Sequence, residues 1–123
     1  MRKQTLTAGA ITLLAFGASL AFAQEMMMMR MKPGMEMSTA DKGYMDAMQK
    51  MHQDTTVMEM TGDADGDFAR MMIPHHQSAI AMAQVLLKQE NVDPQIKTIA
   101  EAIVASQQKE IDEFKTWLAA HPE

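Results

Sequence analysis

Two adjacent histidines and three methionines lie close together in the middle of the chain, within the stretch ARMMIPHHQSAIAMA, residues 69–83. Thioether sulfur is a soft ligand that suits Cu(I), and imidazole binds several transition metals. A thioether needs no deprotonation before it binds, so its affinity for a metal depends less on pH than that of a thiolate. The stretch therefore holds the side chains of a site for a soft cation.

Helical spacing sorts these side chains into pairs. At about 100° per residue, two sulfur and nitrogen pairs lie one turn apart: Met71 with His75, and Met72 with His76. Pro74 stands between the members of each pair, where it removes a backbone N–H and costs a helix about 3 kcal/mol. We expect one kinked, continuous helix, because a fresh start at Pro74 would use the preceding isoleucine as its cap, and isoleucine caps poorly.

The helix predicted before this stretch offers further ligands. A serine cap at Ser38 begins a helix that we expect to run to about Met60, just before a glycine. Met48 lies on its apolar stripe, with Met45 and His52 on the shoulder of that stripe. Packed together, the two helices could turn these atoms toward the paired histidines. The candidate metal ligands are Met45, Met48, His52, Met72, His75, His76 and Met82.

Packing and solvation offer simpler explanations for the same residues. Adjacent histidines in a helix are often solvated or hydrogen-bonded rather than bound to a metal. A methionine stripe at helical spacing is commonly part of a core, because methionine fills irregular gaps well. Composition alone favours core packing for four of these side chains: Met48, Met51, Met58 and Met82.

The segment 24–37, QEMMMMRMKPGMEM, is half methionine. A Pro-Gly pair interrupts any helix there, and its methionines lack the spacing that would give an apolar face. Core packing cannot explain a run that has no face to pack. We expect a flexible arm that captures the cation first, while a weaker alternative makes it a sacrificial target of oxidants.

The first 23 residues have the three parts of a secretory signal: a basic start at Arg2 and Lys3, an apolar run, and a small-x-small site that ends at Ala23. The apolar run is shorter than the roughly 20 residues of a membrane-spanning helix. We therefore predict cleavage near Ala23 and a periplasmic or secreted protein with no membrane anchor. The chain would then comprise a signal (1–23), a methionine arm (24–37) and a helical-bundle domain (38–123).

Composition restricts the partners of the mature chain. Its acids outnumber its bases by 16 to 9 once Arg2 and Lys3 leave with the signal. An acidic surface repels phosphates, so nucleic acid and anionic lipid are poor partners. Cysteine is absent, so no disulfide can compensate for a small core. Stability must come from helix packing, a ligand or self-association, and a homo-oligomer is one expectation.

Helical periodicity accounts for the rest of the chain. We predict a second helix from about Asp65 to Glu90, capped by the acidic run DADGD, which lacks the glycine and glutamate of a calcium loop. Asp93 and Pro94 open a third helix. No segment of the mature chain alternates with a period of two, so we expect an all-α fold with no sheet. Short loops imply an antiparallel bundle of three helices, or four if the arm or another subunit contributes.

Enzymatic chemistry finds no support in the sequence. A di-iron bundle needs Glu-x-x-His, and no glutamate stands three residues before a histidine. The chain has no His-Glu-x-x-His motif, no cysteine nucleophile, and no serine within a recognisable motif. We therefore expect a binding protein rather than an enzyme.

The stretch DFARMMIPHHQSAIAMA, residues 67–83, followed by QQKEIDEFKTWL, residues 107–118, resembles an exported, ferritin-like helical-bundle family. That family is catalogued as a domain of unknown function and includes copper-resistance proteins of the CopM type. The resemblance implies a helical bundle outside the cytoplasm that binds copper through methionine and histidine. It covers about the last two thirds of the chain, so we expect the methionine arm to lie outside the family domain.

By position, the resemblance supports ligand roles for Met72, His75, His76 and Met82. It also implies that Asp67 belongs to the start of the helix, and that the paired helix includes Gln107, Glu110 and Trp117. The sequence departs from the family pattern twice, with Phe114 where methionine is frequent and Ser78 where glycine is frequent. The first departure removes one thioether from the implied ligand set.

Our leading hypothesis is an exported protein that sequesters Cu(I), or Ag(I), or passes it to another copper-handling protein, and so contributes to copper homeostasis or resistance. The alternative is an exported helical chaperone or adaptor, whose flexible methionines would grip apolar partners. Copper binding by the purified protein would distinguish the first hypothesis from the second.

Overall fold

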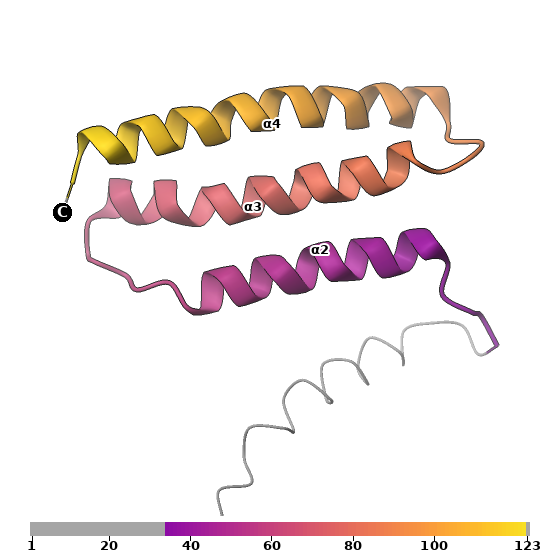
Figure 1. Ribbon diagram of the computed structural model, residues 1–123, viewed down its shortest axis with the longest axis horizontal. Helices are drawn as coiled ribbons and strands as arrows, with labels where there is room; N and C mark the ends of the chain where they lie inside the picture. The colour runs from indigo at the N-terminus through magenta and orange to yellow at the C-terminus, as the bar shows by residue number, and fades with distance from the viewer. Residues whose placement is uncertain (1–33, 123) are drawn as a thin grey trace, which may run out of the picture. The chain divides into compact units, whose positions relative to one another are not determined.

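The computed structural model describes residues 34–122, drawn in colour in Figure 1. The predicted signal and the arm up to residue 33 lie outside the described residues. Three helices follow one another along this part of the chain: α2 (Thr39–Thr56), α3 (Ala64–Leu87) and α4 (Pro94–Ala120). No strand occurs among the described residues, which confirms the all-α prediction, and a bundle of three helices fits. In Figure 1 the chain turns back on itself after α2 and again after α3.

Side-chain caps begin all three helices, as predicted. Ser38 and Asp41 form a capping box at α2, in which each side chain accepts a backbone N–H of the other residue. Asp63 accepts two backbone N–H groups at the start of α3. Asp93 does the same at α4, and Pro94 occupies the first turn, where its missing N–H costs nothing.

Helix α2 ends at Thr56, four residues before the predicted end near Met60. The hydroxyl groups of Thr55 and Thr56 donate back to the carbonyl oxygen of His52, at 3.2 and 2.6 Å. Such bonds weaken a helix, and branched side chains weaken it further. The predicted terminator, Gly62, has a positive φ of 88° but lies in the loop that follows. The prediction of the helix end was wrong because it took only the glycine as a stop signal.

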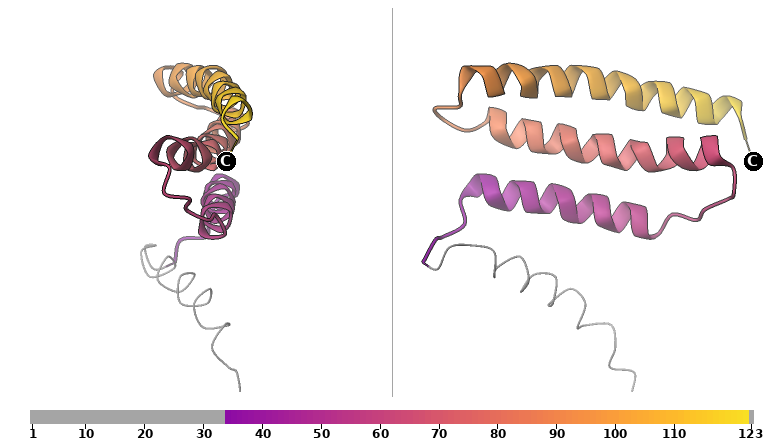
Figure 2. Two further views of the ribbon diagram at one scale, coloured as in Figure 1. Left: turned by 90° about the vertical axis from the view of Figure 1, so that its left-hand side faces the viewer. Right: turned by 180° about the vertical axis from the view of Figure 1, so that it is seen from behind.

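Helix α3 runs without a break through Pro74, as predicted, and forms the middle of the described unit. It packs against α2 on one side and α4 on the other, and within residues 37–122 no Cα atom of α2 lies within 8 Å of one in α4. The end-on view in Figure 2 places α3 between its two neighbours. The three helices therefore form a layer. A kink at Pro74 stays a prediction.

The central position of α3 explains its pattern of burial. On the side toward α4 the buried residues are Ala69, His76, Ile80 and Ala83, and about 180° away, toward α2, they are Pro74 and Ser78. Between these two flanks lies a row of six side chains that neither neighbour covers fully, which we call the α3 stripe: Phe68, Met72, His75, Ala79, Met82 and Leu86.

Small residues bring α2 close to α3. The hydroxyl of Ser78 donates to the carbonyl oxygen of Ala47 at 3.1 Å, and all of these atoms are buried. A Cβ atom at Gly43 would lie 2.7 Å from a methyl carbon of Val85, closer than such atoms approach. Gly43 and Ala47 are one turn apart on α2, so together they make a flat strip against which α3 packs.

Alanine and isoleucine form the buried core of the described unit: Ala47, Ala69, Ile80, Ala83, Ala100 and Ile111. None of the methionines within residues 34–122 is buried. Met48 is 46% exposed, and Met51, Met58 and Met82 are half-buried. The expectation of core packing was therefore wrong for Met48, and for the other three it holds only in part.

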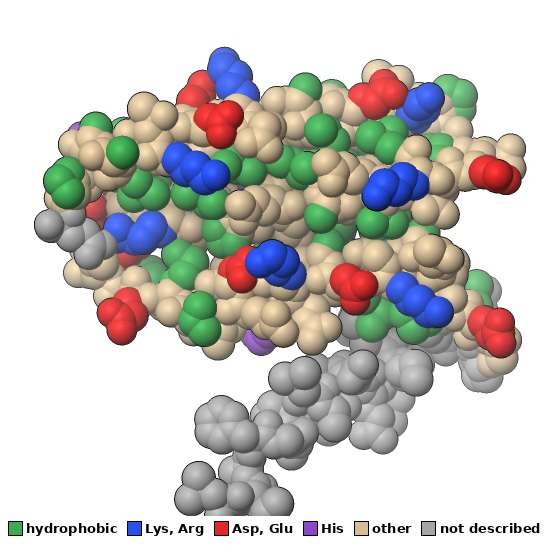
Figure 3. All heavy atoms as spheres, in the orientation of Figure 1, with side chains coloured by type: hydrophobic (Ala, Val, Ile, Leu, Met, Phe, Trp, Pro, Cys, Tyr) green, Lys and Arg blue, Asp and Glu red, His purple; other side chains and the backbone are tan. Residues whose placement is uncertain are grey.

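Charged side chains of both signs spread over all three helices on the face seen in Figure 3, with hydrophobic side chains between them. None of the helices within residues 34–122 is long and apolar enough to cross a membrane. The α3 stripe, by contrast, carries no charged residue. The charge is therefore unevenly distributed around α3.

Asp67 fastens the loop between α2 and α3. One of its oxygens accepts from the backbone N–H and the hydroxyl of Thr61, both at 3.0 Å, and the other accepts from the N–H of Gly62 at 3.1 Å. The guanidinium of Arg70 lies 2.9 Å from the first oxygen. These contacts, led by the bond from Arg70, lower the pKa of Asp67 from 3.8 to about 2.

This network predicts a loss of stability in acid. A carboxyl group with a lowered pKa stabilises the folded state fully above its unfolded pKa of 3.8, and loses that contribution as the pH falls toward about 2. We expect the Tm to fall between pH 4 and pH 2 more steeply in the wild type than in an Asp67→Asn variant, which should already have the lower Tm at pH 7. Thermal unfolding by circular dichroism at several pH values checks this. Parallel pH profiles for the two proteins would contradict it.

Candidate functional site

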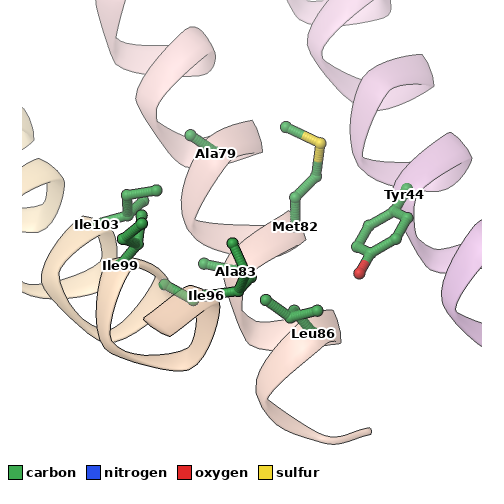
Figure 4. Close-up of a pocket in the computed structure, with 9 residues that line it drawn as sticks. Tyr44, Ala79, Met82, Ala83, Leu86, Ile96, Ile99 and Ile103 are labelled. Carbon is green, nitrogen blue, oxygen red and sulfur yellow. The ribbon is translucent and has the colours of Figure 1, made fainter. Parts of the chain in front are cut away.

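The α3 stripe divides into two apolar ends with a histidine between them. At one end it forms a groove with its two neighbours, shown in Figure 4, where Tyr44 reaches in from α2 and three isoleucines stand on α4. The groove has a volume of about 240 Å³. No charged side chain lines it: its residues are Tyr44, Ala79, Met82, Ala83, Leu86, Ile96, Ile99, Ala100 and Ile103.

The other end of the stripe is aromatic and bordered by acids. The rings of Phe68 and Phe114 meet edge to face, with centroids 5.9 Å apart. Phe68 is nevertheless 53% exposed. Asp65 and Glu113 line the same hollow, together with Trp117. This end combines exposed aromatic surface with negative charge.

His76 does not belong to the stripe but turns toward α4. Its ring is 6% exposed and meets Phe114 edge to face at 5.6 Å. Its Nε2 lies 2.6 Å from a carboxylate oxygen of Glu110, whose side chain is half exposed. An ionised carboxylate only accepts hydrogen bonds, so Nε2 carries the hydrogen and, in the neutral ring, Nδ1 carries the lone pair. Nδ1 is buried and finds no hydrogen-bond partner within the described residues.

His75 is exposed on the stripe, and its ring centroid lies 6.0 Å from that of His76. The sequence suggested that both histidines could face the first helix. The structure separates them instead, because adjacent residues on a helix point about 100° apart. Met71 is exposed and Met72 is half-buried, both within one turn of His75. Met71, Met72 and His75 are therefore the closest group of candidate ligands on α3.

The candidates on α2 do not join this group. Met45 and His52 lie about 140–160° around α2 from Ala47, which contacts α3, so they face away from α3. His52 is exposed and Met45 is half-buried. Met48 lies nearer the edge of the α2 and α3 contact. Within the described residues, no group of three or more histidine, aspartate or glutamate side chains could hold a metal ion.

Length along α3 also limits what one chain can do. Met82 follows His75 by seven residues, which is about 10 Å along a helix. Ligands to one metal ion lie about 2.0–2.3 Å from it, so these two side chains of one copy could share an ion only if both extended along the helix toward one another. In one copy, a soft cation can be held by His75 with Met71 or Met72, while the lone pair of His76 at Nδ1 offers a further nitrogen beside Met72. The residue types fit the ion, but the described chain supplies only part of a coordination shell.

Sequence reasoning missed the role of Glu110 and placed it only on the paired helix. Little in the sequence indicated this role, because a glutamate on the exposed side of a helix is common and usually faces solvent. Gln107 gave a clearer signal, since it is a polar residue in the apolar stripe of α4, and its side-chain oxygen is buried without a partner among residues 34–122. Together with His76 Nδ1, it marks the interface between α3 and α4 as a place with unmet polar groups.

Over 54 residues the chain is 41% identical to an uncharacterized protein, L153, of Acanthamoeba polyphaga mimivirus. That match covers 44% of this chain and 35% of the viral protein, so the chain spans about a third of the length of this relative.

A family model named Domain of unknown function (DUF305) matches residues 17–118. The match begins before the methionine arm, so the expectation that the arm lies outside the family domain was wrong. That expectation rested on the two motif stretches of α3 and α4 alone, which do not reach the arm. The chain belongs to the family described as Domain of unknown function (DUF305).

Proposed function

We propose that this protein binds Cu(I), or the similarly soft Ag(I), outside the cytoplasm, and that it sequesters the ion or passes it to another copper-handling protein. The observation that carries the proposal is that its described methionines are left out of the core. Alanine and isoleucine form the buried core, so the thioethers of Met48, Met71 and Met72 remain available to bind a ligand. His75 lies within one helical turn of Met71 and Met72 and is exposed.

The surroundings of these side chains suit a soft cation of low charge. Thioether and neutral imidazole bring no net charge to the site, and Cu(I) needs less charge compensation than a divalent ion. The apolar stripe around His75 would limit water near the bound ion. The apparent signal sequence and the absence of cysteine support a place outside the cytoplasm, where a thiol would oxidise and a thioether would not form a disulfide. A ferritin-like, antiparallel bundle completes the proposal.

Each candidate has a separate role in this proposal. His75 binds the ion first, with a thioether of Met71 or Met72. His76 contributes through Nδ1, held in that tautomer by the carboxylate of Glu110, as outer partners commonly orient a metal-binding histidine. Met45, Met48 and His52 form a lower-affinity group on α2, and Met82 lies in the apolar groove. The protein carries out no turnover in this proposal.

Titration of the metal-free protein with Cu(I), against a chelator of known affinity, tests the proposal. We expect the His75→Ala, His76→Ala double variant to bind Cu(I) about 10- to 100-fold more weakly, because it loses both nitrogen ligands of α3. A His121→Ala variant is the matched control, since this exposed histidine stacks on Trp117 far along α4. If the wild type binds no more tightly than the double variant, the proposal fails.

The apolar groove favours a second candidate function. A chaperone or adaptor that grips apolar partners would use the exposed surface around Tyr44, Met82 and Ile99. This function predicts that metal-free protein suppresses the aggregation of an unfolded client. Light scattering of a heated client protein, with and without a copper chelator, would separate it from the first proposal.

A further inference from the structure

The side of α3 that carries the α3 stripe is apolar, whereas the opposite side is polar. Helical spacing puts Arg70, Gln77 and Gln84 on that opposite side, about 180° from the stripe. The stripe itself holds no charged residue, and it continues onto α4 through Ile96 and Ile99, each 47% exposed. A helix with one apolar and one polar side buries the apolar one against another element.

Neither neighbour in the layer can cover this surface. Helices α2 and α4 pack against the two flanks of α3, and within residues 37–122 their Cα atoms stay more than 8 Å apart. The interior of the layer is also thin, since Ile111 is its largest fully buried side chain. Apolar surface that is continuous over several turns, next to so small a core, is typical of a protein interface.

The size of the surface fits a dimer. A helix of 24 residues is about 36 Å long and two neighbouring helices are about 20 Å wide, so the joint face of α3 and α4 that contains the stripe, polar residues included, measures roughly 700 Å² per copy. A stable interface needs about 800 Å² per partner. Ala79, the smallest side chain of the stripe, lies midway between two large apolar ones, Met72 and Leu86, each seven residues away.

We propose that a second copy of this chain covers the α3 stripe, with a two-fold axis close to Ala79 and perpendicular to α3, so that the two α3 helices run antiparallel. In a two-fold interface each copy presents the same patch, so the middle of the patch meets itself. Ala79 lets the two α3 helices approach closely there, as small residues do. Met72 of one copy then lies opposite Leu86 of the partner subunit, because the two residues stand seven positions on either side of Ala79.

This arrangement has a consequence for the metal site, which rests on the function proposed above. His75 lies four residues before Ala79, and Met82 lies three residues after it. A two-fold axis near Ala79 therefore brings His75 of one copy opposite Met82 of the partner subunit. Within one chain their backbone positions are about 10 Å apart along the helix, whereas across the interface they lie opposite one another. The dimer completes two equivalent sites, each with ligands from both copies.

The oligomeric state of the metal-free protein tests the inference. The protein is purified after export, its N-terminal residue is determined by mass spectrometry, and its mass in solution is measured by sedimentation at micromolar concentration. We expect a dimer. Ala79→Arg should weaken association at least tenfold, since it puts a charge in the middle of the apolar patch. Gln77→Arg adds the same charge on the polar side of α3 and should leave the dimer intact.

Two further measurements keep the result interpretable. Circular dichroism must show equal helicity for Ala79→Arg and the wild type. If Ala79→Arg loses helicity, Ile99→Lys, at an exposed position of α4, replaces it as the test variant. A monomeric wild type overturns the inference, and so does an Ala79→Arg variant that dimerises normally. A monomer in which the chain's own residues 24–33 protect the stripe from hydrogen exchange also overturns it.

Mixing two variants tests the shared site. A His75→Ala copy and a Met82→Ala copy together retain one intact pair if the pair is formed between copies, and none if it is formed within one chain. We expect the mixture to regain about a quarter of the shared Cu(I) sites of the wild type, because half of its dimers are mixed and each mixed dimer keeps one of two sites, while each variant alone has none. A dimer without copper binding would refute the proposed function and leave the interface standing. Copper binding by a monomer would refute the interface and leave the proposed function standing.

Discussion

Replacing His76 by alanine is expected to lower the Tm by roughly 10–20 °C, whereas the same change at His75 should shift it by less than about 3 °C. The two residues are neighbours in sequence, but His76 is buried against Phe114 and His75 is exposed. Removing the buried ring leaves a cavity and costs about 2–3 kcal/mol, while an exposed position costs about 0.5 kcal/mol or less. Thermal unfolding of both variants gives the comparison.

Copper titration of the same pair separates binding from folding. His75→Ala should lose Cu(I) affinity with almost no change in Tm, so its defect would belong to the site alone. Glu110→Gln is a useful companion, because its amide oxygen can still accept the hydrogen of Nε2 and keep His76 in place. Equal losses of Tm at the two histidines would show that they share one environment, contrary to the structure.

Replacing Gly43 by leucine is expected to cost about 2–3 kcal/mol, or roughly 10–20 °C in Tm. Even a single Cβ atom there would lie 2.7 Å from a methyl carbon of Val85, whose branched side chain cannot turn away freely. Gly43→Ala should fall between the wild type and Gly43→Leu, because the better helix propensity of alanine, about 1 kcal/mol, offsets part of the clash. Thermal unfolding of the three proteins establishes the order.

Hydrogen exchange shows which helix of the Gly43→Leu variant loses stability. Because α2 contacts only α3, Gly43→Leu should deprotect the amides of α2 first and leave those of α3 and α4 largely protected. Gln49→Leu is the control: it adds a leucine to the same helix on an exposed side. A Gly43→Leu variant as stable as Gln49→Leu would mean that α2 does not pack closely through Gly43.

Local signals in the sequence predicted most of the helical framework. Ser38, Asp63 and Asp93 begin the helices because short polar side chains cap them, and this physics acts over two or three residues. The continuity of α3 through Pro74 was predicted because a new helix starting there would need Ile73 as its cap, and isoleucine caps poorly. The end of α2 was missed, because the threonine side chains act there through bonds to the backbone that only the folded helix shows.

The candidate site was less predictable, because it depends on which helix each face meets. Helical spacing places Phe68, His75 and Met82 on one side of α3, but spacing alone does not show that neither neighbour covers that side fully. The separation of His75 from His76 follows from helix geometry once α4 is placed on one flank. The contact of His76 with Glu110 joins residues 34 positions apart, and no local pattern encodes it.

The layered arrangement of the helices also bears on how the chain folds. Since α2 meets only α3, and α3 meets α4 through the next loop, every pair of packed helices within residues 37–122 is consecutive in sequence. Each pairing therefore closes a short loop, and short loops cost little chain entropy. Helical proteins with such local contacts fold in microseconds to milliseconds. Fast folding would leave little time for the apolar stripe to aggregate, in a chain that has no disulfide to form on the way.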